Sequence, residues 1–418
     1  MSIAIWVAAT LFATWLILNL TLGNKQIDTR LARLYPVASE QFPRAMGALF
    51  GPTLLAGNRV QALLNGGEAF PAMLEAIREA RHTITFETYV FWSGSIGEAF
   101  AEALSERARA GIKVHVLLDW IGGQLEDAQL ERMRRDGIEI RRYNAPSWFN
   151  LHRLNNRTHR KLMVVDGKIG FTGGIGIADQ WRGHAQDPQH WRDTHFRLEG
   201  PAVAQMQSAF VDNWMQTTGE VLHGEGFLPP LPAAGASVAQ VFTSSPGGGA
   251  ESMQLMYLLS IAAAAESIRI SASYFVPDNV AVRALVAALE RGVRVTIIVP
   301  GPYMDMGIVR RASRAEWGPL LEAGAVIHEY QPTMYHAKVV IVDAQWVSVG
   351  STNFDNRSFS INDEANLNVY DAAFARRQVE VFERDLERSR RVTLEEWRSR
   401  PWLDKALDFG ASLLSSQL

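Results

Sequence analysis

The sequence predicts an α/β protein made of two similar halves, with an apolar helix ahead of them. Three observations support this fold class. Helices and strands alternate along most of the chain, the same order of elements occurs twice, and a long apolar run stands near the start. Strands that alternate with helices favour a mainly parallel sheet in each half, with helices on both of its faces. We expect the two halves to pack about a pseudo-twofold axis.

The length and composition are those of a globular protein. The chain has 418 residues, of which 47% are apolar and 20% are charged, and it is long enough for two domains of ordinary size. Its 41 basic and 44 acidic residues leave a net charge of -3, which gives no general attraction for nucleic acid. The sequence has no cysteine, so disulfides, thiolate metal ligands and cysteine nucleophiles are excluded.

The first apolar run extends from Ile3 to Leu22 without a charged side chain. About 20 apolar residues in a helix span the core of a bilayer. A cleaved signal peptide would have a shorter apolar region, a basic start and a small-residue cleavage site, so the run predicts a transmembrane anchor. A buried helix of a soluble domain is the alternative. Basic residues follow at Lys25, Arg30, Arg33 and Arg44, which predicts a single-pass protein with its remainder in the cytoplasm.

The elements of the first half recur in the second half in the same order. Helices are expected at 68–80 and 96–111 and again at 251–266 and 279–292, with strands at 83–92, 112–120, 267–277 and 293–301. Each copy continues through another helix and strand, at 130–144 and at 318–332. Gly111 and Gly292 end corresponding helices, where a left-handed residue is favourable. The chain therefore contains a duplicated unit.

The expected organisation has five segments. They are an anchor helix at 1–24, a first half at 50–222, a linker at 223–237, a second half at 238–400 and an amphipathic tail at 401–418. The linker is rich in Pro, Gly and Ala, which is typical of connections between domains. The tail places Trp402, Leu403, Leu407 and Leu413 at helical spacings. It is either a docked terminal helix or a helix that lies on a membrane surface.

One motif occurs at equivalent points of the two copies. It has the form H-x-K-x4-D, and its residues are His159, Lys161 and Asp166 in the first half and His336, Lys338 and Asp343 in the second. Residues two apart on a strand share a face, so each histidine points the same way as its lysine. A single short match has a high chance rate. Two matches at equivalent points of a duplication indicate one shared site.

Two histidine–lysine pairs supply the groups that phosphodiester transfer needs, namely a nucleophile, an acid and cationic donors for the phosphoryl oxygens. One imidazole would attack phosphorus to form a phosphohistidine. The other would protonate the leaving oxygen and then deprotonate the incoming alcohol. Lys161 and Lys338 would hold the phosphoryl oxygens. These groups include no metal or cofactor.

The motif histidines need orienting partners, because a nucleophilic histidine must be neutral with the correct nitrogen free. Asp193 and Glu364 occupy matching places after the two motifs and are the candidates for this role. Asp166 and Asp343 complete the motif but lie across a turn. We expect them to fix the loop or hold the lysine rather than touch the substrate.

The two motifs, together with GSTNFDNRS after the second, resemble the phospholipase D superfamily. From about Gly57 to the C-terminus the chain is similar to bacterial cardiolipin synthases. Further matching stretches are ETYVFW, RLNNRTHRK, FTGG, WRDTHFRLEGP and SYFVP. The resemblance implies two fused phospholipase D-like α/β halves, no metal, and the bacterial inner membrane as location. It also implies that His159 is the nucleophile and His336 the acid and base, roles that the residues alone leave open.

The resemblance also implies an asymmetric phosphate site. Asn353 matches the family's phosphate-contacting asparagine, but the constant offset between the motifs puts Gly176 at the equivalent point of the first half. Ser351 or a backbone N–H would have to replace the missing amide. Gly174 and Ser351, which close the two motif segments, are therefore predicted with Asn353 to bind substrate.

The implied reaction joins two phosphatidylglycerol molecules to give cardiolipin and glycerol. The anchor, the apolar tail and the ring pair Trp148 and Phe149 favour a lipid substrate. Basic residues before the first motif either attract an anionic head group or form a solvated surface; they are Arg141, Arg142, Arg153 and Arg157. Three alternatives remain: a phospholipase in which water resolves the phosphohistidine, a nuclease, and a membrane scaffold without activity. The acidic balance disfavours nucleic acid, and two intact motifs disfavour the scaffold.

Overall fold

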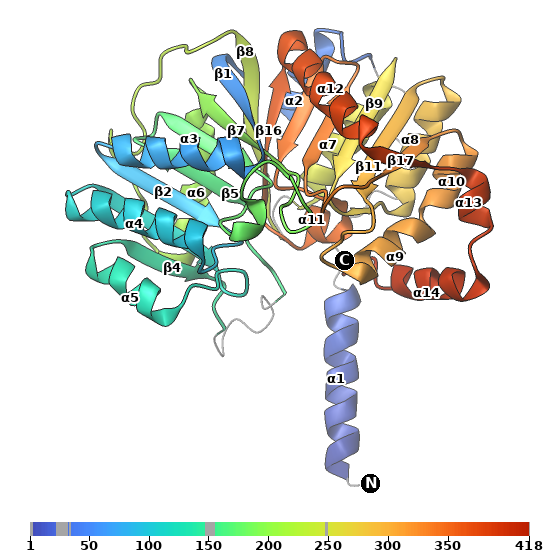
Figure 1. Ribbon diagram of the computed structural model, residues 1–418, viewed down its shortest axis with the longest axis horizontal. Coiled ribbons are helices and arrows are strands. Elements are labelled where there is room, and N and C mark those ends of the chain that lie inside the picture. Colours follow the sequence, from blue (N-terminus) through green and yellow to red (C-terminus); the bar gives the residue numbers. More distant parts are fainter. Residues whose placement is uncertain (1–2, 22–31, 33–34, 147–154, 247–249, 418) are drawn as a thin grey trace.

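The computed structural model describes residues 3–21, 32, 35–146, 155–246 and 250–417. Two α/β halves lie side by side, and helix α1 (Ile3–Thr21) projects away from them (Figure 1). Helix α2 (Gln41–Leu49) precedes the first half in sequence. It nevertheless packs into the core of the second half, through Phe42 and Met46.

The first half follows the expected order of elements. Its elements are β1 (Leu55–Leu64), α3 (Asn65–Glu79), β2 (Thr83–Thr88), α4 (Ser95–Arg109), β3 (Lys113–Asp119), α5 (Asp127–Arg135), β4 (Glu139–Tyr143), β5 (Lys161–Val165), β6 (Ile169–Gly173), the short helix η2 (Asp179–Trp181), β7 (Thr194–Glu199) and α6 (Val203–Thr218). The strand expected over 83–92 ends at Thr88. The residues after it turn towards the site described below.

The second half repeats this order. Its elements are β8 (Ser237–Ser244), α7 (Ala250–Ala263), β9 (Ser267–Ala272), β10 (Phe275–Val276), α8 (Asn279–Glu290), β11 (Arg294–Pro300), α9 (Gly307–Ala315), α10 (Trp317–Glu322), β12 (Val326–Tyr330), β13 (Lys338–Val342), β14 (Trp346–Gly350), β15 (Phe354–Asp355), α11 (Asn356–Ser360), β16 (Glu364–Tyr370) and α12 (Ala372–Glu387). The chain closes with β17 (Ser389–Val392), α13 (Leu394–Arg398) and α14 (Trp402–Ser412).

One continuous sheet runs through both halves. Across the described residues it has 15 strands in the order β17-β12-β11-β9-β13-β14-β16-β8-β1-β7-β6-β5-β2-β3-β4. Read outward from the central β8–β1 pair, the two directions give equivalent strands: β16 matches β7, β14 matches β6, β13 matches β5, and β9 matches β2. The sheet therefore has the twofold order that the duplication predicts.

The expectation of a mainly parallel sheet was wrong. Only β2, β3 and β4, and their counterparts β9, β11 and β12, are parallel neighbours in this sheet. The motif strands β5 and β13 instead form antiparallel hairpins with β6 and β14. The central β1–β8 pair is antiparallel as well. Crossovers through helices thus give parallel neighbours among the outer strands, whereas short turns connect β5 to β6 and β13 to β14.

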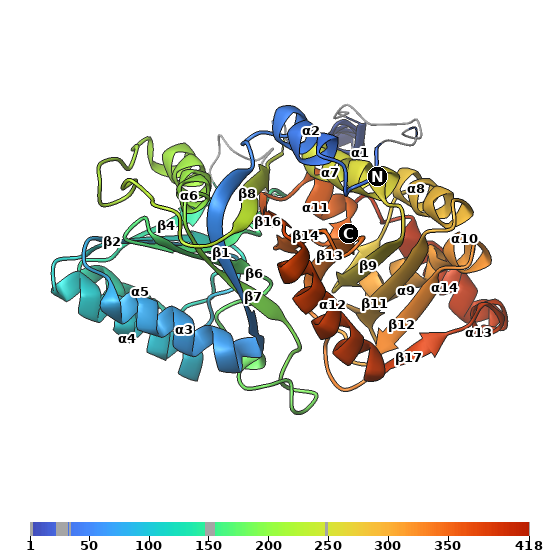
Figure 2. The same cartoon turned by 90° about the horizontal axis from the view of Figure 1, so that it is seen from above.

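Helices cover both faces of the sheet, as expected. Figure 2 shows α6 on one face of the first half and α3, α4 and α5 on the other, whereas α7 and α8 lie opposite α12 in the second half. A shared core joins the halves, because Leu162 and Phe196 of the first half and Leu367 and Phe374 of the second belong to one buried apolar cluster. We infer that the halves fold as one body.

Helix α1 covers most of the apolar run that predicts an anchor. Its described side chains are exposed, including Trp6, Leu11, Phe12 and Trp15. Within the described parts of the chain, the helices all fall short of the length and apolarity needed to cross a membrane. The predicted transmembrane helix is therefore not confirmed. Trp148, Phe149 and Arg153 lie outside the described residues.

Candidate active site

Each motif histidine is held by a segment of the opposite half. His159 and His336 stand just before the motif strands β5 and β13. The backbone N–H of His159 donates to the carbonyl of Asp363 at 2.9 Å, and that of His336 donates to the carbonyl of Arg192 at 2.7 Å. Because these bonds cross the seam, they bring the two motifs together.

The orienting carboxylates also cross between the halves. Nδ1 of His159 lies 2.9 Å from Glu364 Oε1, and Nδ1 of His336 lies 2.7 Å from Asp193 Oδ2. Both carboxylates are fully buried. A carboxylate acceptor keeps the proton of a neutral imidazole on Nδ1 and leaves the lone pair on Nε2. Each half thus supplies a histidine and the carboxylate for the other half's histidine.

Two lysines are buried beside the histidines. Lys161 Nζ donates to the carbonyl of His159 at 2.7 Å, and Lys338 Nζ donates to the carbonyl of His336 at 2.8 Å and to Ser273 Oγ at 2.7 Å. Burial lowers the pKa of Lys161 to about 7 and that of Lys338 to about 8. Nearby carboxylates oppose this effect only in part. An anion between the lysines would stabilise their charged forms.

The histidines are neutral at neutral pH. Burial lowers the pKa of His159 to about 4, although the charge of Glu364 opposes the shift. Burial also lowers the pKa of His336, and the charge of Lys338 adds to the effect. Burial acts to raise the pKa of Glu364, but His159, the charge of Lys161 and the Ser351 hydroxyl together outweigh burial, and the pKa ends below its usual value. The site thus combines neutral imidazoles, ionised carboxylates and lysines that are ready to bind an anion.

The sequence of this chain is similar to those of known proteins. Residues 73–187 and 257–386 match the family described as "Cardiolipin synthase, PLD-like domain". The chain belongs to this family. It is 37% identical over 350 residues to cardiolipin synthase A of Pseudomonas aeruginosa, covering 83% of this chain and 71% of that protein. It is 35% identical over 361 residues to cardiolipin synthase A of Pseudomonas syringae, covering 84% and 74%.

Solved structures share the fold at low sequence identity. Phosphatidylserine synthase from Haemophilus influenzae superposes with a TM-score of 0.70 at 15% identity, covering 90% of this chain and 99% of that one. Polyphosphate kinase from Porphyromonas gingivalis superposes with a TM-score of 0.55 at 15% identity, covering 89% and 53%. These likenesses concern the fold alone.

In this member of the cardiolipin synthase family the two carboxylates have different neighbours. Glu364 accepts a hydrogen bond from the Ser351 hydroxyl. Asp193 accepts one from the Trp181 indole at 2.9 Å. Gly174, at the position that matches Ser351, lies so close that a Cβ there would meet Asp193 Oδ1 at 2.2 Å. Gly174 and Ser351 therefore contact the carboxylates, and their expected binding of substrate stays a prediction.

The asparagine position of the family is also asymmetric. The Asn353 Oδ1 accepts a hydrogen bond from the Ser273 hydroxyl at 2.6 Å, which links it to Lys338. A Cβ at Gly176 would meet Val90 Cβ at 2.7 Å and the Trp181 ring at 3.2 Å. The space of a second asparagine is thus filled by packed side chains. The second half carries the polar cluster and the first half does not.

The motif aspartates lie away from the histidines. The Asp166 carboxylate accepts backbone N–H groups of residues 81–83, and that of Asp343 accepts those of residues 265–267. β5 pairs with β2 so that Lys161 and Val165 lie at opposite ends, and Asp166 follows Val165. The aspartates therefore fix loops at the far end of the motif strands, as their place across the turn suggests. Contact with the substrate does not fit this position.

Aromatic rings around the histidines were missed by the sequence reasoning. The Tyr89 ring lies 5.3 Å from that of His159 and 5.7 Å from Lys161 Nζ. The rings of Trp181 and Trp191 lie 5.3 and 5.4 Å from that of His336. Tyr89 and Trp191 fall in ETYVFW and WRDTHFRLEGP, which are among the stretches that resemble the family. The sequence alone did not show which histidine ring each of these aromatic rings would contact.

Buried ion pairs support the segments that hold the histidines. Arg160 Nη2 lies 3.6 Å from Asp363 Oδ1, and the Tyr143 hydroxyl donates to the same carboxylate at 2.7 Å. A second pair also crosses the seam, because Nε and Nη2 of Arg192 each donate to Asp385 at 2.8 Å. Removing one partner of such a pair leaves a buried charge uncompensated. The geometry of each histidine thus depends on residues that do not touch it.

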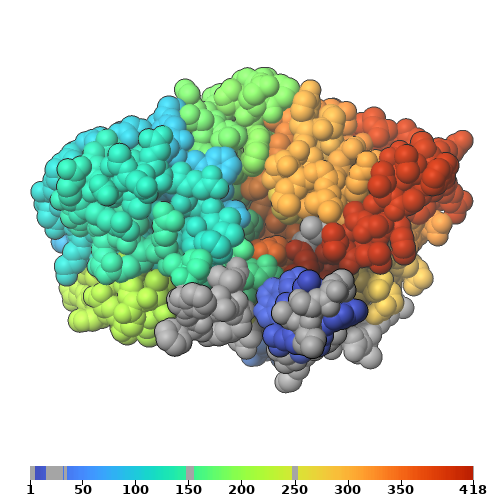
Figure 3. Space-filling model, turned by 90° about the horizontal axis from the view of Figure 1, so that it is seen from below, coloured from blue at the N-terminus to red at the C-terminus, as the bar shows by residue number. Residues whose placement is uncertain are grey.

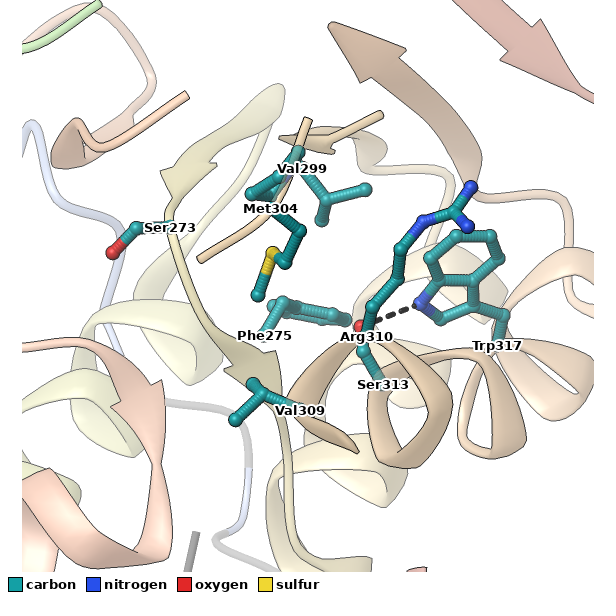
Figure 4. Close-up of a pocket in the computed structure, with 9 residues that line it drawn as sticks. Ser273, Phe275, Val299, Met304, Val309, Arg310, Ser313 and Trp317 are labelled. Carbon is teal, nitrogen blue, oxygen red and sulfur yellow. Dashed lines mark hydrogen bonds between the residues drawn. The ribbon is translucent and has the colours of Figure 1, made fainter. Parts of the chain in front are cut away.

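A small pocket lies next to Ser273 in the second half (Figure 4). Its walls are mostly apolar, with Phe275, Val299 and Met304 among them, and Ser273 turns its hydroxyl away from them. It lacks both motif pairs, so it is not the reaction site. Among the described residues, the histidine and carboxylate groups form no cluster that could hold a metal ion.

Proposed function

We propose that this protein is a cardiolipin synthase, a phosphatidyltransferase that joins two phosphatidylglycerol molecules through a phosphohistidine intermediate. The observation that carries the proposal is the pair of histidine–lysine units whose orienting carboxylates cross between the halves. Both imidazoles are neutral and both lysines are buried beside them. The relatives named cardiolipin synthase A support phosphatidylglycerol as the substrate.

The first step forms the intermediate. His159, oriented by Glu364, attacks phosphorus through Nε2 while the bond from phosphorus to the glycerol oxygen breaks. His336 gives its proton to that oxygen, and glycerol leaves. Lys161 and Lys338 balance the charge on the phosphoryl oxygens. The anionic phosphodiester that the lysines bind also favours the protonated form of His336, which Asp193 faces.

The second step consumes the intermediate. The glycerol hydroxyl of another phosphatidylglycerol gives its proton to His336, and its oxygen attacks phosphorus. The bond between phosphorus and His159 breaks, which returns the imidazole to its neutral state and releases cardiolipin. Asn353, which Ser273 links to Lys338, would donate an amide N–H to a phosphoryl oxygen. The nucleophile assignment rests on the family resemblance.

Two apolar elements support attachment to a membrane. Helix α1 exposes large apolar side chains and projects from the body (Figure 1). Helix α14 has two acidic residues, of which Asp408 is buried and lies 2.8 and 2.5 Å from Arg314 and Arg400. Its outward face carries Trp402 and Phe409, which are 79% and 64% exposed. A surface helix in water normally buries its large apolar side chains and exposes its acidic ones, so this arrangement is the reverse.

Both elements are on one side of the molecule. Figure 3 shows the blue residues of α1 and the red C-terminal region on the same face, with the red region at the outer side of the second half. We propose that α1 anchors the protein in a membrane and that α14 rests on its surface. The active site would then meet phospholipid at the bilayer surface.

A product analysis tests the reaction. Purified protein is incubated with phosphatidylglycerol labelled in its phosphate, dispersed in neutral detergent, and the lipids are separated. We expect labelled cardiolipin with release of one glycerol per cardiolipin. Phosphatidic acid as the main product would make the protein a hydrolase instead, because water rather than lipid alcohol would resolve the intermediate.

A further inference from the structure

A cardiolipin synthase has to accommodate two phosphates at once, so this inference rests on the proposed function. The donor phosphate occupies the space between Lys161 and Lys338. The acceptor phosphatidylglycerol brings an intact phosphodiester, one glycerol unit away from the hydroxyl that attacks. This second anion comes close to the donor phosphate, and without cationic partners the two would repel each other.

Two arginines from opposite halves meet on the segment that leads into the first motif. The Arg357 Nη2 donates to the carbonyl of Asn155 at 3.0 Å, and the Arg157 Nη1 donates to the carbonyl of Asn156 at 3.1 Å. Both guanidinium groups therefore bind the backbone just before the first motif, and the charge of Arg357 acts on that of Arg157. Arg357 lies on α11, just after Asn353 in the chain, and Arg157 precedes His159 by two residues.

The arginines are adjacent to the reaction centre. The ring of Tyr89 contacts that of His159 with centroids 5.3 Å apart. The charges of both Arg157 and Arg357 act on the Tyr89 phenol, whose pKa burial raises. The carbonyl of Arg157 accepts the backbone N–H of Asp363 at 2.8 Å, directly before Glu364. The pair therefore lies beside the first histidine.

The two guanidinium groups are suited to an anion. Arg357 also donates to the backbone carbonyl of Gln417 at 3.2 Å and to the side-chain oxygen of Asn155, both of which are neutral. Arg157 lies over the ring of Trp120 at 5.3 Å. Burial lowers the pKa of Arg157. The charge of Asp119 opposes this shift, whereas the charge of Arg357 lowers the pKa further. An anion between the arginines would relieve their mutual repulsion.

We propose that Arg157 and Arg357 bind the phosphodiester of the acceptor phosphatidylglycerol and so place its glycerol hydroxyl at the phosphohistidine. Arginine forks match the geometry of phosphate oxygens. An acceptor without a phosphate, such as free glycerol, gains nothing from this pair. The arginines therefore select a lipid alcohol over small alcohols and water.

The test compares two acceptors for the same intermediate. Purified full-length protein in detergent micelles of phosphatidylglycerol is assayed for cardiolipin formation, and separately for exchange of labelled free glycerol into phosphatidylglycerol. We expect Arg157→Gln and Arg357→Gln each to lower kcat/KM for cardiolipin formation about tenfold or more, because each removes charge-assisted hydrogen bonds. Glycerol exchange should change by less than about twofold.

The controls separate the possible outcomes. Arg109→Gln removes the same charge from an exposed arginine that pairs with Glu102 on α4, and it should leave both reactions unchanged. Arg357→Lys keeps the charge but not the fork and should lose less than Arg357→Gln. A parallel loss of both reactions, or no loss of cardiolipin formation, in folded variants would overturn the acceptor site. If the unaltered protein catalyses neither reaction, the proposed function itself fails.

Discussion

At the scale of single residues, the central feature is the exchange of carboxylates between the halves. Glu364→Gln and Asp193→Asn keep the shape of the side chain but remove the charge that each histidine faces. We expect each variant to lower kcat on the order of 10²–10⁴-fold, since proton transfer and the correct tautomer are lost together. The measurement is cardiolipin formation at saturating phosphatidylglycerol.

Thermal unfolding of the two variants is the control for this result. A loss of activity in protein that unfolds near the temperature of the unaltered chain assigns the effect to the histidines. Near-normal kcat in a folded variant would show that the carboxylate does not position its histidine.

The space at Gly174 gives a second prediction. Gly174→Ala would bring a methyl group against the Asp193 carboxylate, where a Cβ meets Oδ1 at 2.2 Å. We expect a cost of about 1–3 kcal/mol in the free energy of unfolding and a loss of activity, because Asp193 must move away from His336. Gly307→Ala is the matched control, since a Cβ there meets nothing within 4 Å. Equal behaviour of the two variants in denaturant titrations would contradict this account.

The lysines predict how activity depends on pH. Their pKa values of about 7 and about 8 in the free protein mean that they lose charge as the pH rises through this range. The charged form binds the donor phosphate, so kcat/KM should fall as the pH rises through 7 and 8. His159, with a pKa of about 4, becomes protonated and loses its nucleophilic lone pair only on the acid side. If kcat/KM for phosphatidylglycerol rose steadily above about pH 8, the charged lysines could not be the groups that bind the donor phosphate.

The residue pattern predicted the motif pairs but not all of their surroundings. Asp193 and Glu364 were recognisable as orienting groups from their matching places after the motifs. Their exchange between halves was not predictable, because it depends on how the strands meet at the seam. Ser273 and Tyr89 fall in the matching stretches SYFVP and ETYVFW, but the sequence did not show which motif residues they contact.

At the scale of elements, the helices and outer strands were predictable and the strand directions were not. Asp166 and Gly167 form the tight turn between β5 and β6, and an Asp–Gly pair between two strands is a hairpin signal. Giving that signal more weight than the alternation with helices would have predicted the antiparallel centre. In the second half the turn has Asp343 and Ala344, both with positive φ. Because alanine replaces the glycine there, this turn lacks the Asp–Gly pair that indicates a hairpin.

The exposed face of α14 makes a prediction at the same scale. Trp402→Glu combined with Phe409→Glu places two charges on the outward face, and we expect it to weaken binding to anionic phospholipid vesicles in a flotation assay. Activity in detergent micelles should be unchanged, because α14 contributes none of the motif residues. Leu49→Glu is the control, since Leu49 is 65% exposed on α2, at the opposite side of the body (Figure 1). Equal loss of binding in both proteins would count against α14 as a contact with the membrane.

At the scale of the whole molecule, one sheet and a shared core join two copies of a unit into a single site. The duplication in the sequence predicted that His159 and His336 would converge. The seam that makes this possible was not predictable, because β1 and β8 lie far apart in the chain and meet as antiparallel neighbours. Asn58 is buried on β1 at this seam, where its side-chain amide donates to the carbonyl of Ser237 on β8 at 3.4 Å and to that of Leu55 at 2.6 Å.

The most direct test of the account is cardiolipin formation by His159→Ala and His336→Ala, each purified and shown to be folded. His223→Ala is the control, because it removes a histidine that is neither in a motif nor buried. The account predicts that either motif variant loses cardiolipin formation by about 10³-fold or more, while the control keeps it. Wild-type activity in either motif variant would contradict a site that needs both histidines.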